Sequence, residues 1–294
     1  MFPWLASAIF APLLGAQQVP GRDLLDFPVG TTGEPPPLAR LSGVGIWNPA
    51  AIVLPSDARG RVSAAALQTP ADQGVTLQLL AVAARLPADR TLALSVVRAW
   101  VDGLVRTNLD PQSVGPEIAY NTTVVSAALA QRRDNLAAGV AARYRFGEAD
   151  GNREGVFGLD GGVQIEHLFP MDLAIGVSSF LWRPGDEGSD QWTLAAATDV
   201  RVFGPDSLHQ LRGGYAFSAT GQSADQHSAY ASGRYMHWEG RIGLSRYAVH
   251  GMHDWRTHLG VALRYSRYTV GVAREENGAG LAPIYQFTLV MLIK

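Results

Sequence analysis

The sequence contains no cysteine, one lysine and few charged residues of either sign. Of its 294 residues, 17% are charged, and the formal net charge is −2. Without cysteine the chain has no disulfide, no thiolate nucleophile, no thiolate metal site and no cysteine to carry a lipid. Its positive charge is almost all arginine, because Lys294 is the only lysine, and it forms no basic tract. Nothing therefore indicates nucleic-acid binding.

The sequence also lacks a long apolar run. No stretch approaches the roughly 18 residues that a membrane-spanning helix needs, so we expect no transmembrane helix. Residues 1–16 are apolar and end in the small residues Gly15 and Ala16. This pattern predicts a secretory signal peptide that is cleaved near Ala16.

From Arg61 onward, apolar and polar residues alternate with a period of two. In residues 255–266, for example, Trp255, Leu259 and Tyr265 fall on one face, and Arg256 and Arg264 fall on the other. Successive side chains of a β-strand point to opposite faces, so such segments have one apolar and one polar face.

Alternation alone also describes a soluble β-sandwich. Three features favour the membrane: aromatic residues end the apolar faces, the segments are about 11 to 13 residues long, and short turns alternate with polar loops. The longer loops are expected at residues 148–154, 183–190, 220–226 and 275–280.

The alternating segments number about fourteen, with twelve as the alternative. They span residues 61–69, 75–85, 91–106, 117–131, 136–147, 156–168, 172–183, 191–203, 208–219, 226–237, 239–250, 255–266, 268–275 and 282–293. In hydrocarbon an open sheet edge would leave backbone groups unpaired, so the sheet must close. We therefore predict an all-β fold, an antiparallel transmembrane β-barrel over residues 61–294, in the outer membrane of a Gram-negative-type bacterium.

Residues 17–60 precede the barrel and are predicted to form an N-terminal extension and a short plug. Residues 17–37 are rich in proline and should be extended or irregular. Residues 38–55 are apolar and small, and contain Trp47, Asn48, Pro49 and Ala50. Asn48 precedes a proline, so its backbone should be extended and its amide should cap a turn that begins at Pro49. Trp47 should fill space inside the barrel.

The segment Gly43-Val44-Gly45-Ile46-Trp47-Asn48-Pro49-Ala50-Ala51-Ile52 resembles the hatch motif of the long-chain fatty-acid transporter (FadL) superfamily of outer-membrane barrels. That superfamily includes the PorV and PorQ proteins of type IX secretion. The resemblance implies a signal peptide, an N-terminal plug that bears Asn-Pro-Ala, and fourteen strands.

Charged and amide side chains on the polar faces are predicted to face the lumen. They are Arg143, Arg145, Asp160, Gln164, Glu166, Asp199, Arg201, Arg212, Arg256 and Arg264. We expect them to fill or wet the lumen as a network, in preference to forming a specific anion site.

Histidines offer the one cluster that suggests a metal, at His250, His253 and His258 with Asp254. A loop–strand junction would separate their side chains, so we expect surface or interfacial histidines and no metal site. A lipid hydrolase would need a Ser–His pair facing the bilayer, and no motif marks one. We predict no catalytic residues, no cofactor and no enzyme activity.

Three functions remain open for such a barrel. The first is passage of small hydrophobic molecules, with residues 38–55 as the plug. The second is a PorV-like scaffold that binds an exported protein of a secretion system, and the third is an outer-membrane lipid hydrolase. The expected partners are membrane lipids, a hydrophobic small-molecule ligand or a secretion-system protein.

Overall fold

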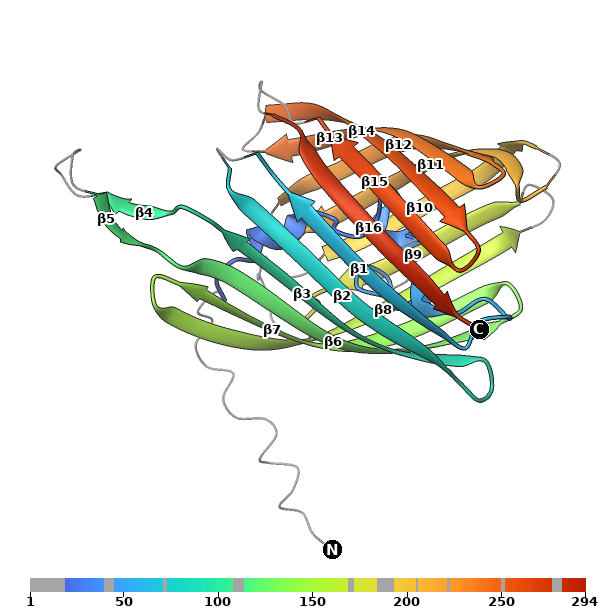
Figure 1. Ribbon diagram of the computed structural model, residues 1–294, viewed down its shortest axis with the longest axis horizontal. Coiled ribbons are helices and arrows are strands. Elements are labelled where there is room, and N and C mark those ends of the chain that lie inside the picture. The colour runs from blue at the N-terminus through green and yellow to red at the C-terminus, as the bar shows by residue number, and fades with distance from the viewer. Residues whose placement is uncertain are drawn as a thin grey trace, which may run out of the picture.

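Long antiparallel strands form one closed barrel in the computed structural model (Figure 1). The structure describes residues 19–39, 45–70, 73–107, 114–168, 172–183, 193–204, 206–220, 223–249, 252–276 and 282–294. The predicted signal peptide, residues 1–16, lies outside the described residues. Fourteen strands make the wall, which confirms the predicted fold class and excludes the alternative of twelve.

Each predicted segment overlaps one strand of the wall. The strands are β1 (Gly60–Gln68), β2 (Val75–Leu86), β3 (Arg90–Val101), β6 (Tyr120–Arg133), β7 (Leu136–Ala149), β8 (Asn152–Leu168), β9 (Leu173–Phe180), β10 (Thr193–Phe203), β11 (His209–Thr220), β12 (Ser223–Tyr235), β13 (Trp238–Val249), β14 (Met252–Tyr265), β15 (Tyr268–Glu275) and β16 (Ile284–Ile293). Neighbours in sequence pair in order, and β1 pairs with β16 from Gly60↔Ile293 to Gln68↔Tyr285 to close the sheet.

The two ends of the barrel differ. We call the end where β1 begins and β16 ends the turn end, and the opposite end the loop end. Two of the predicted long loops are wrong, because the strands continue through them. β7 and β8 remain paired to Ala149↔Asn152, and β11 and β12 to Thr220↔Ser223. Polar residues at these strand ends pair with one another across the sheet, as Arg153 does with Glu148 at 3.1 Å, so polarity there does not mean a loop.

A hairpin at the loop end was not predicted. The third segment was expected to continue to Arg106, but β3 ends at Val101, and Gly103 has a φ of +73° that breaks the extended backbone. The chain then forms β4 (Val105–Thr107) and β5 (Val114–Glu117), a separate two-stranded sheet. Figure 1 shows this hairpin projecting beyond the barrel wall.

The outward face of the wall is apolar and carries aromatic side chains near both ends. The exposed aromatics near the turn end are Phe203, Tyr235, Trp238, Tyr265 and Tyr268, and those towards the loop end are Phe146, Phe157, Trp182, Trp255 and Tyr285. Exposed Leu, Val and Ile side chains lie between them, for example Leu80, Leu94 and Leu259.

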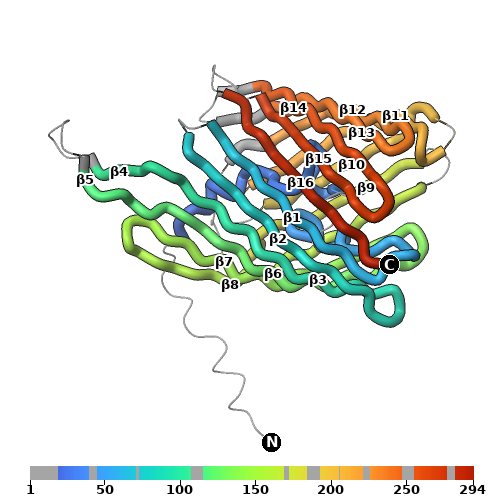
Figure 2. Tube along the Cα trace, viewed as in Figure 1, coloured from blue at the N-terminus to red at the C-terminus, as the bar shows by residue number. Residues whose placement is uncertain are grey.

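Residues 19–39 and 45–59 form a plug inside the barrel, drawn in blue within the wall in Figure 2. The plug contains three short 3₁₀ helices, η1 (Asp23–Asp26), η2 (Pro36–Leu38) and η3 (Pro49–Ile52). Its apolar side chains pack on the small and aliphatic inward residues of β1, β2 and β3 in the main hydrophobic cluster. None of the helices in the described part of the chain is long and apolar enough to cross a membrane.

Glycines in the wall let the plug backbone come close. Gly139 on β7 pairs with Gly162 on β8, and both face η3. A Cβ atom at Gly139 would lie 2.5 Å from the backbone carbon of Pro49, and one at Gly162 would lie 2.0 Å from Asn48 Oδ1. The wall therefore presents bare backbone where the plug approaches most closely.

We predict that Gly139→Ala lowers the free energy of unfolding of the barrel by about 1–3 kcal/mol, because its methyl group overlaps the plug backbone. Gly161→Ala is the matched control, since a Cβ at the neighbouring outward position meets nothing within 4 Å. Urea unfolding in detergent micelles, followed by heat-modifiable gel migration, measures both. Equal midpoints for the two variants would contradict the packing described here.

Candidate functional site

The lumen is the candidate functional site, and the Trp-Asn-Pro-Ala motif lies at its centre. Asn48 has extended backbone, with φ −141° and ψ 110°, and its Oδ1 accepts a hydrogen bond from Ala50 N–H at 2.9 Å at the start of η3. Its Nδ2 donates to Pro37 O at 2.8 Å, which ties η3 to η2. Trp47 donates from Nε1 to Val29 O at 2.9 Å, and its ring lies 4.7 Å from that of Phe180 on β9.

Arginines of the wall hold the carbonyl groups of the plug. Five of them donate to plug carbonyls: Arg145 to Val19 at 2.8 Å, Arg241 to Thr32 at 3.0 Å, Arg143 to Gly45 at 3.3 Å, Arg61 to Val53 at 3.0 Å and Arg85 to Ala58 at 2.9 Å. A plug whose only regular elements are three short 3₁₀ helices leaves many carbonyls unpaired, and buried ones need a donor. The guanidinium group supplies several donors from one side chain.

Of the residues predicted to face the lumen, Arg143 and Asp160 form an ion pair whose side chains are fully buried. Asp160 Oδ1 also accepts from Trp182 N–H at 3.0 Å, and the Arg143 guanidinium lies 5.0 Å from the centre of the Phe180 ring. Gln164, four residues after Asp160 on the same face of β8, is buried as well.

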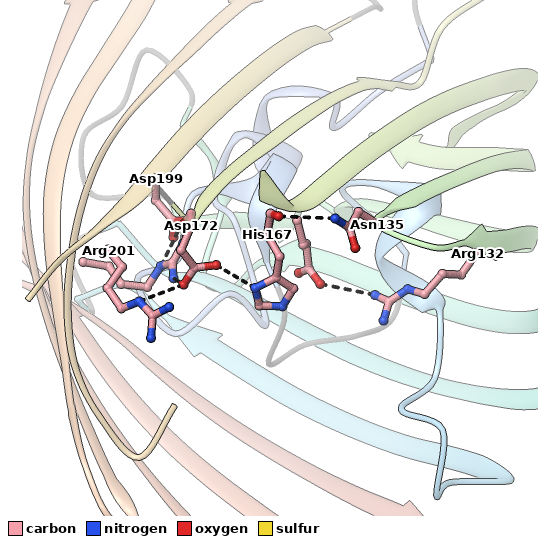
Figure 3. A network of polar contacts seen from close by, with 8 residues as sticks. Arg132, Asn135, His167, Asp172, Asp199 and Arg201 are labelled. Atoms are coloured by element: carbon pink, nitrogen blue, oxygen red, sulfur yellow. Dashed lines mark hydrogen bonds and ion pairs between the residues drawn. The ribbon is translucent and has the colours of Figure 1, made fainter. Parts of the chain in front are cut away.

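Four more of these residues belong to a network at the turn end, around the connection between β8 and β9 (Figure 3). Asp172 lies at its centre and accepts from Arg212 at 3.0 Å, from Arg201 at 3.0 Å and from the His167 ring at 2.6 Å. Arg212 also binds Asp199 Oδ1 at 2.6 Å. On the other side of His167, Glu166 pairs with Arg132 at 3.3 Å.

The remaining two residues lie on β14 and contact carboxylates that the sequence interpretation missed. Arg264 pairs with Glu239 at 2.5 Å, and Arg256 pairs with Glu275 at 3.4 Å. Arg241, also missed, pairs with Glu34 of the plug at 2.9 Å and with Glu239. Glu239 and Arg241 are two residues apart, on the polar face of their segment. This spacing could have predicted that both face the lumen.

The histidine prediction is wrong for His258. Its side chain points into the lumen, where Nε2 lies 2.6 Å from Ser245 Oγ and Nδ1 lies 3.2 Å from Glu275 Oε2. His258 is on β14, on the face opposite to the outward Trp255 and Leu259. Its inward position could therefore have been predicted from the alternation of the sequence. The side chains of His250, His253 and Asp254 lie outside the described residues. Within the described part of the chain, no group of three or more His, Asp or Glu side chains could hold a metal ion.

Two cavities lie between the plug and the wall of β9 to β16. The larger, of about 260 Å³, extends to Thr193, Thr220 and Glu275 near the loop end. The smaller, of about 90 Å³, is lined by Arg212, Arg234, Glu239 and Arg264 near the turn end. Glu34, Pro35 and Tyr230 line both cavities, so the contact of Glu34 with Arg241 lies between them.

No family model matches the chain, and no curated protein matches its sequence. Among solved structures, the chain is similar to an engineered protein described for asymmetric conductivity, at 10% identity, 80% of this chain, 98% of that chain and a TM-score of 0.40. It is also similar to mutants of the Rhodopseudomonas blastica porin. One has 9% identity, 80% and 99% coverage and a TM-score of 0.41, and another has 9% identity, 80% and 98% coverage and a TM-score of 0.39.

The turn-end network should make the stability of the barrel depend on pH. Partial burial by itself raises the pKa of the Asp172 carboxyl, but hydrogen bonds from His167 and Arg212 outweigh it and hold that pKa below its ordinary value. A lowered folded-state pKa stabilises the fold above the unfolded value, near pH 3.9, and this contribution is lost as pH falls through the folded value.

We therefore expect Asp172→Asn to be less stable than the natural protein at pH 7, with the difference shrinking as pH falls from about 4 to below the folded pKa. Urea midpoints at pH 7 and at acid pH measure this. Asp134→Asn, at the turn between β6 and β7, is the control and should leave the pH dependence unchanged. A difference between Asp172→Asn and the natural chain that stays constant with pH would count against the assigned role of the network.

Proposed function

We propose that the protein is an outer-membrane channel that passes small hydrophobic or amphiphilic molecules through its lumen, with the plug controlling passage at Glu34. The observation that carries this proposal is the pair of cavities on the two sides of the Glu34–Arg241 contact. Together they follow the wall of β9 to β16 from near one end of the barrel to near the other. Glu34 and Pro35 of the plug and Tyr230 of β12 line both.

The outward face supports a place in a membrane. Aliphatic side chains cover the middle of the wall, and exposed aromatic residues lie towards both ends, as lipid-facing barrels require. The inward face instead carries the buried charges, such as Arg143 and Asp160. A soluble protein would leave its charged face in water and its apolar face inside, which is the reverse of this arrangement.

The lining of the larger cavity favours a solute with apolar and polar parts. Apolar surface comes from Leu25 and Trp47 of the plug and from Phe180 and Ile284 of the wall. Serine and threonine hydroxyls line the wall, among them Ser218, Thr220 and Ser228. The resemblance of residues 43–52 to the fatty-acid transporter hatch motif points to the same class of solute.

Breaking the contact between the cavities should open the path. We predict that Glu34→Ala raises the flux of small amphiphilic solutes into proteoliposomes several-fold, because Arg241 loses its carboxylate partner on the plug and keeps only the carbonyl of Thr32 there. Asp23→Ala is the control: it removes another plug carboxylate, one that accepts from Tyr120 at 2.7 Å and lines neither cavity. Liposome swelling with a homologous series of solutes is the measurement. If Glu34→Ala and Asp23→Ala leave flux equally unchanged, the proposed path is wrong.

A second function, a PorV-like scaffold for an exported protein, is favoured by the β4–β5 hairpin. This hairpin projects from the loop end between β3 and β6 (Figure 1), and Arg106 of β4 forms an ion pair with Asp150 at the turn between β7 and β8. It offers an edge that a partner strand could pair with.

Deleting residues 104–118 and joining β3 to β6 by a short glycine linker should abolish capture of a stoichiometric partner from envelope extracts. Flux through the lumen should remain the same, because the hairpin lines neither cavity. Failure of the full-length protein to capture any stoichiometric partner would remove the scaffold proposal and leave the channel proposal untouched.

A further inference from the structure

Three residues of the larger cavity, one on each of three neighbouring strands, form a connected polar chain. Ser245 is on β13, His258 on β14 and Glu275 at the end of β15. His258 Nε2 lies 2.6 Å from Ser245 Oγ, and its Nδ1 lies 3.2 Å from Glu275 Oε2. All three residues line the larger cavity.

The register of the sheet explains how these side chains meet. His258 pairs directly with Glu275 across β14 and β15, so their Cβ atoms are close neighbours on the inward face. On the other side, His258 pairs with Gly243, and a Cβ there would lie 3.8 Å from His258 Cδ2. A Cβ at that distance would make ordinary van der Waals contact with the imidazole, which leans along β13 past Gly243 towards Ser245, two residues further on.

Ser245, His258 and Glu275 have the connectivity of a hydrolytic triad. It consists of a hydroxyl, an imidazole that contacts the hydroxyl through one nitrogen, and a carboxylate that contacts the other nitrogen. Glu275 is held by a second donor, since Arg256 Nη1 lies 3.4 Å from its Oε1. A carboxylate fixed in this way selects the imidazole tautomer with the proton on Nδ1. Nε2 is then free of its proton and can accept the hydrogen of the Ser245 hydroxyl.

A side-chain donor for a developing negative charge lies on the strand next to Ser245. In the register, Ser245 is directly opposite Ser228 on β12 and Arg256 on β14. Backbone N–H groups of the wall are used in the sheet, so side chains must supply any such donors. Ser228 also lines the larger cavity, so its hydroxyl can donate to an oxyanion formed on a substrate attacked by Ser245, whereas Arg256 contacts Glu275.

We propose that Ser245, His258 and Glu275 hydrolyse carboxylic esters with short acyl chains that enter the larger cavity. Ser245 Oγ attacks the carbonyl carbon while His258 Nε2 takes the hydroxyl proton. The tetrahedral intermediate collapses, the C–O bond to the alcohol breaks, and His258 returns the proton to the leaving alcohol. A water molecule then attacks the acyl-serine, His258 takes its proton and passes it to Ser245 Oγ, and the free acid leaves.

In this proposal Ser245 and His258 are the catalytic residues, and Glu275 is a positioning residue that acts through His258. The apolar plug residues Leu25 and Trp47, with Phe180 of β9, offer surface for the acyl group. The site faces the lumen. It therefore differs from the bilayer-facing Ser–His pair that a hydrolase of membrane lipids would need, and long-chain esters should be poor substrates.

The first experiment is covalent labelling of the folded protein in detergent with a fluorescent fluorophosphonate. The expected result is one labelled serine, mapped by mass spectrometry to Ser245, with labelling lost in Ser245→Ala and His258→Ala. Ser126→Ala is the matched control, because Ser126 is an equally buried serine on the inward face of β6 and lies outside the cavity. It should be labelled as strongly as the natural chain. Heat-modifiable migration verifies that each variant has folded.

The second experiment is hydrolysis of p-nitrophenyl butyrate, with p-nitrophenyl palmitate as the long-chain comparison. Ser245→Ala and His258→Ala should each lower kcat by about 100-fold or more, the usual scale for loss of a nucleophile or general base. Glu275→Gln should lower kcat more than it changes KM and should shift the pH–rate profile, whereas a purely structural change would lower the rate without moving that profile.

Absence of labelling at Ser245 in the folded natural protein, or butyrate hydrolysis that Ser245→Ala does not reduce, would overturn the proposal. Faster hydrolysis of palmitate than of butyrate would overturn the assigned substrate class. The outcome is separate from that of the channel proposal, because solute flux in Glu34→Ala is measured without any ester.

Discussion

Closure of the sheet between β1 and β16 is the constraint on which the rest of this structure depends. Nine residue pairs, from Gly60↔Ile293 to Gln68↔Tyr285, join the first strand of the wall to the last and leave no strand edge in the ring. In a bilayer each unpaired N–H or C=O of an open edge would cost several kcal/mol. The closed ring also creates the inside, where charged side chains such as Arg143 and Asp160 are removed from lipid.

The inside is filled by a segment that has little secondary structure of its own, and this explains the arginines. Carbonyls of Val19, Thr32 and Gly45 accept from Arg145, Arg241 and Arg143, three side chains that rise from the wall. Where the plug comes closest, the wall has Gly139 and Gly162 in place of side chains. The wall and the plug are therefore complementary in two ways, by donors where the plug is distant and by bare backbone where it is near. The arc from β9 to β16 is less completely filled, and both cavities lie there.

The sequence predicts the wall well and the interior poorly, for a physical reason. Alternation of residues such as Trp255 and Arg256 reports directly on the outward and inward faces of the wall, so the fourteen strands and the inward side of the ten polar residues could be derived from it. What each inward side chain contacts depends on the strand register and on the path of the plug. A period of two in the sequence gives the face on which a residue lies, but neither the register nor that path. Arg143 was expected in a network that fills or wets the lumen, and its burial against Asp160 and the plug could not be derived from the alternation. The contact of His258 with Ser245 and Glu275 follows from pairing across three strands and could be recognised only once that pairing was known.

The plug runs without a break into β1, since Ala58 and Arg59 lead directly to Gly60, and Arg59 N–H already bonds to Ile293 O at 2.7 Å. β16, which pairs with β1 to complete the ring, is the last of the fourteen wall strands in sequence, whereas the plug precedes all of them. The part of the chain that fills the ring is therefore covalently tied to the strand at which the ring closes, and arginines of the wall bind its carbonyls from several sides. A change at the seam between β1 and β16 thus acts on the filling of the lumen as well as on the wall.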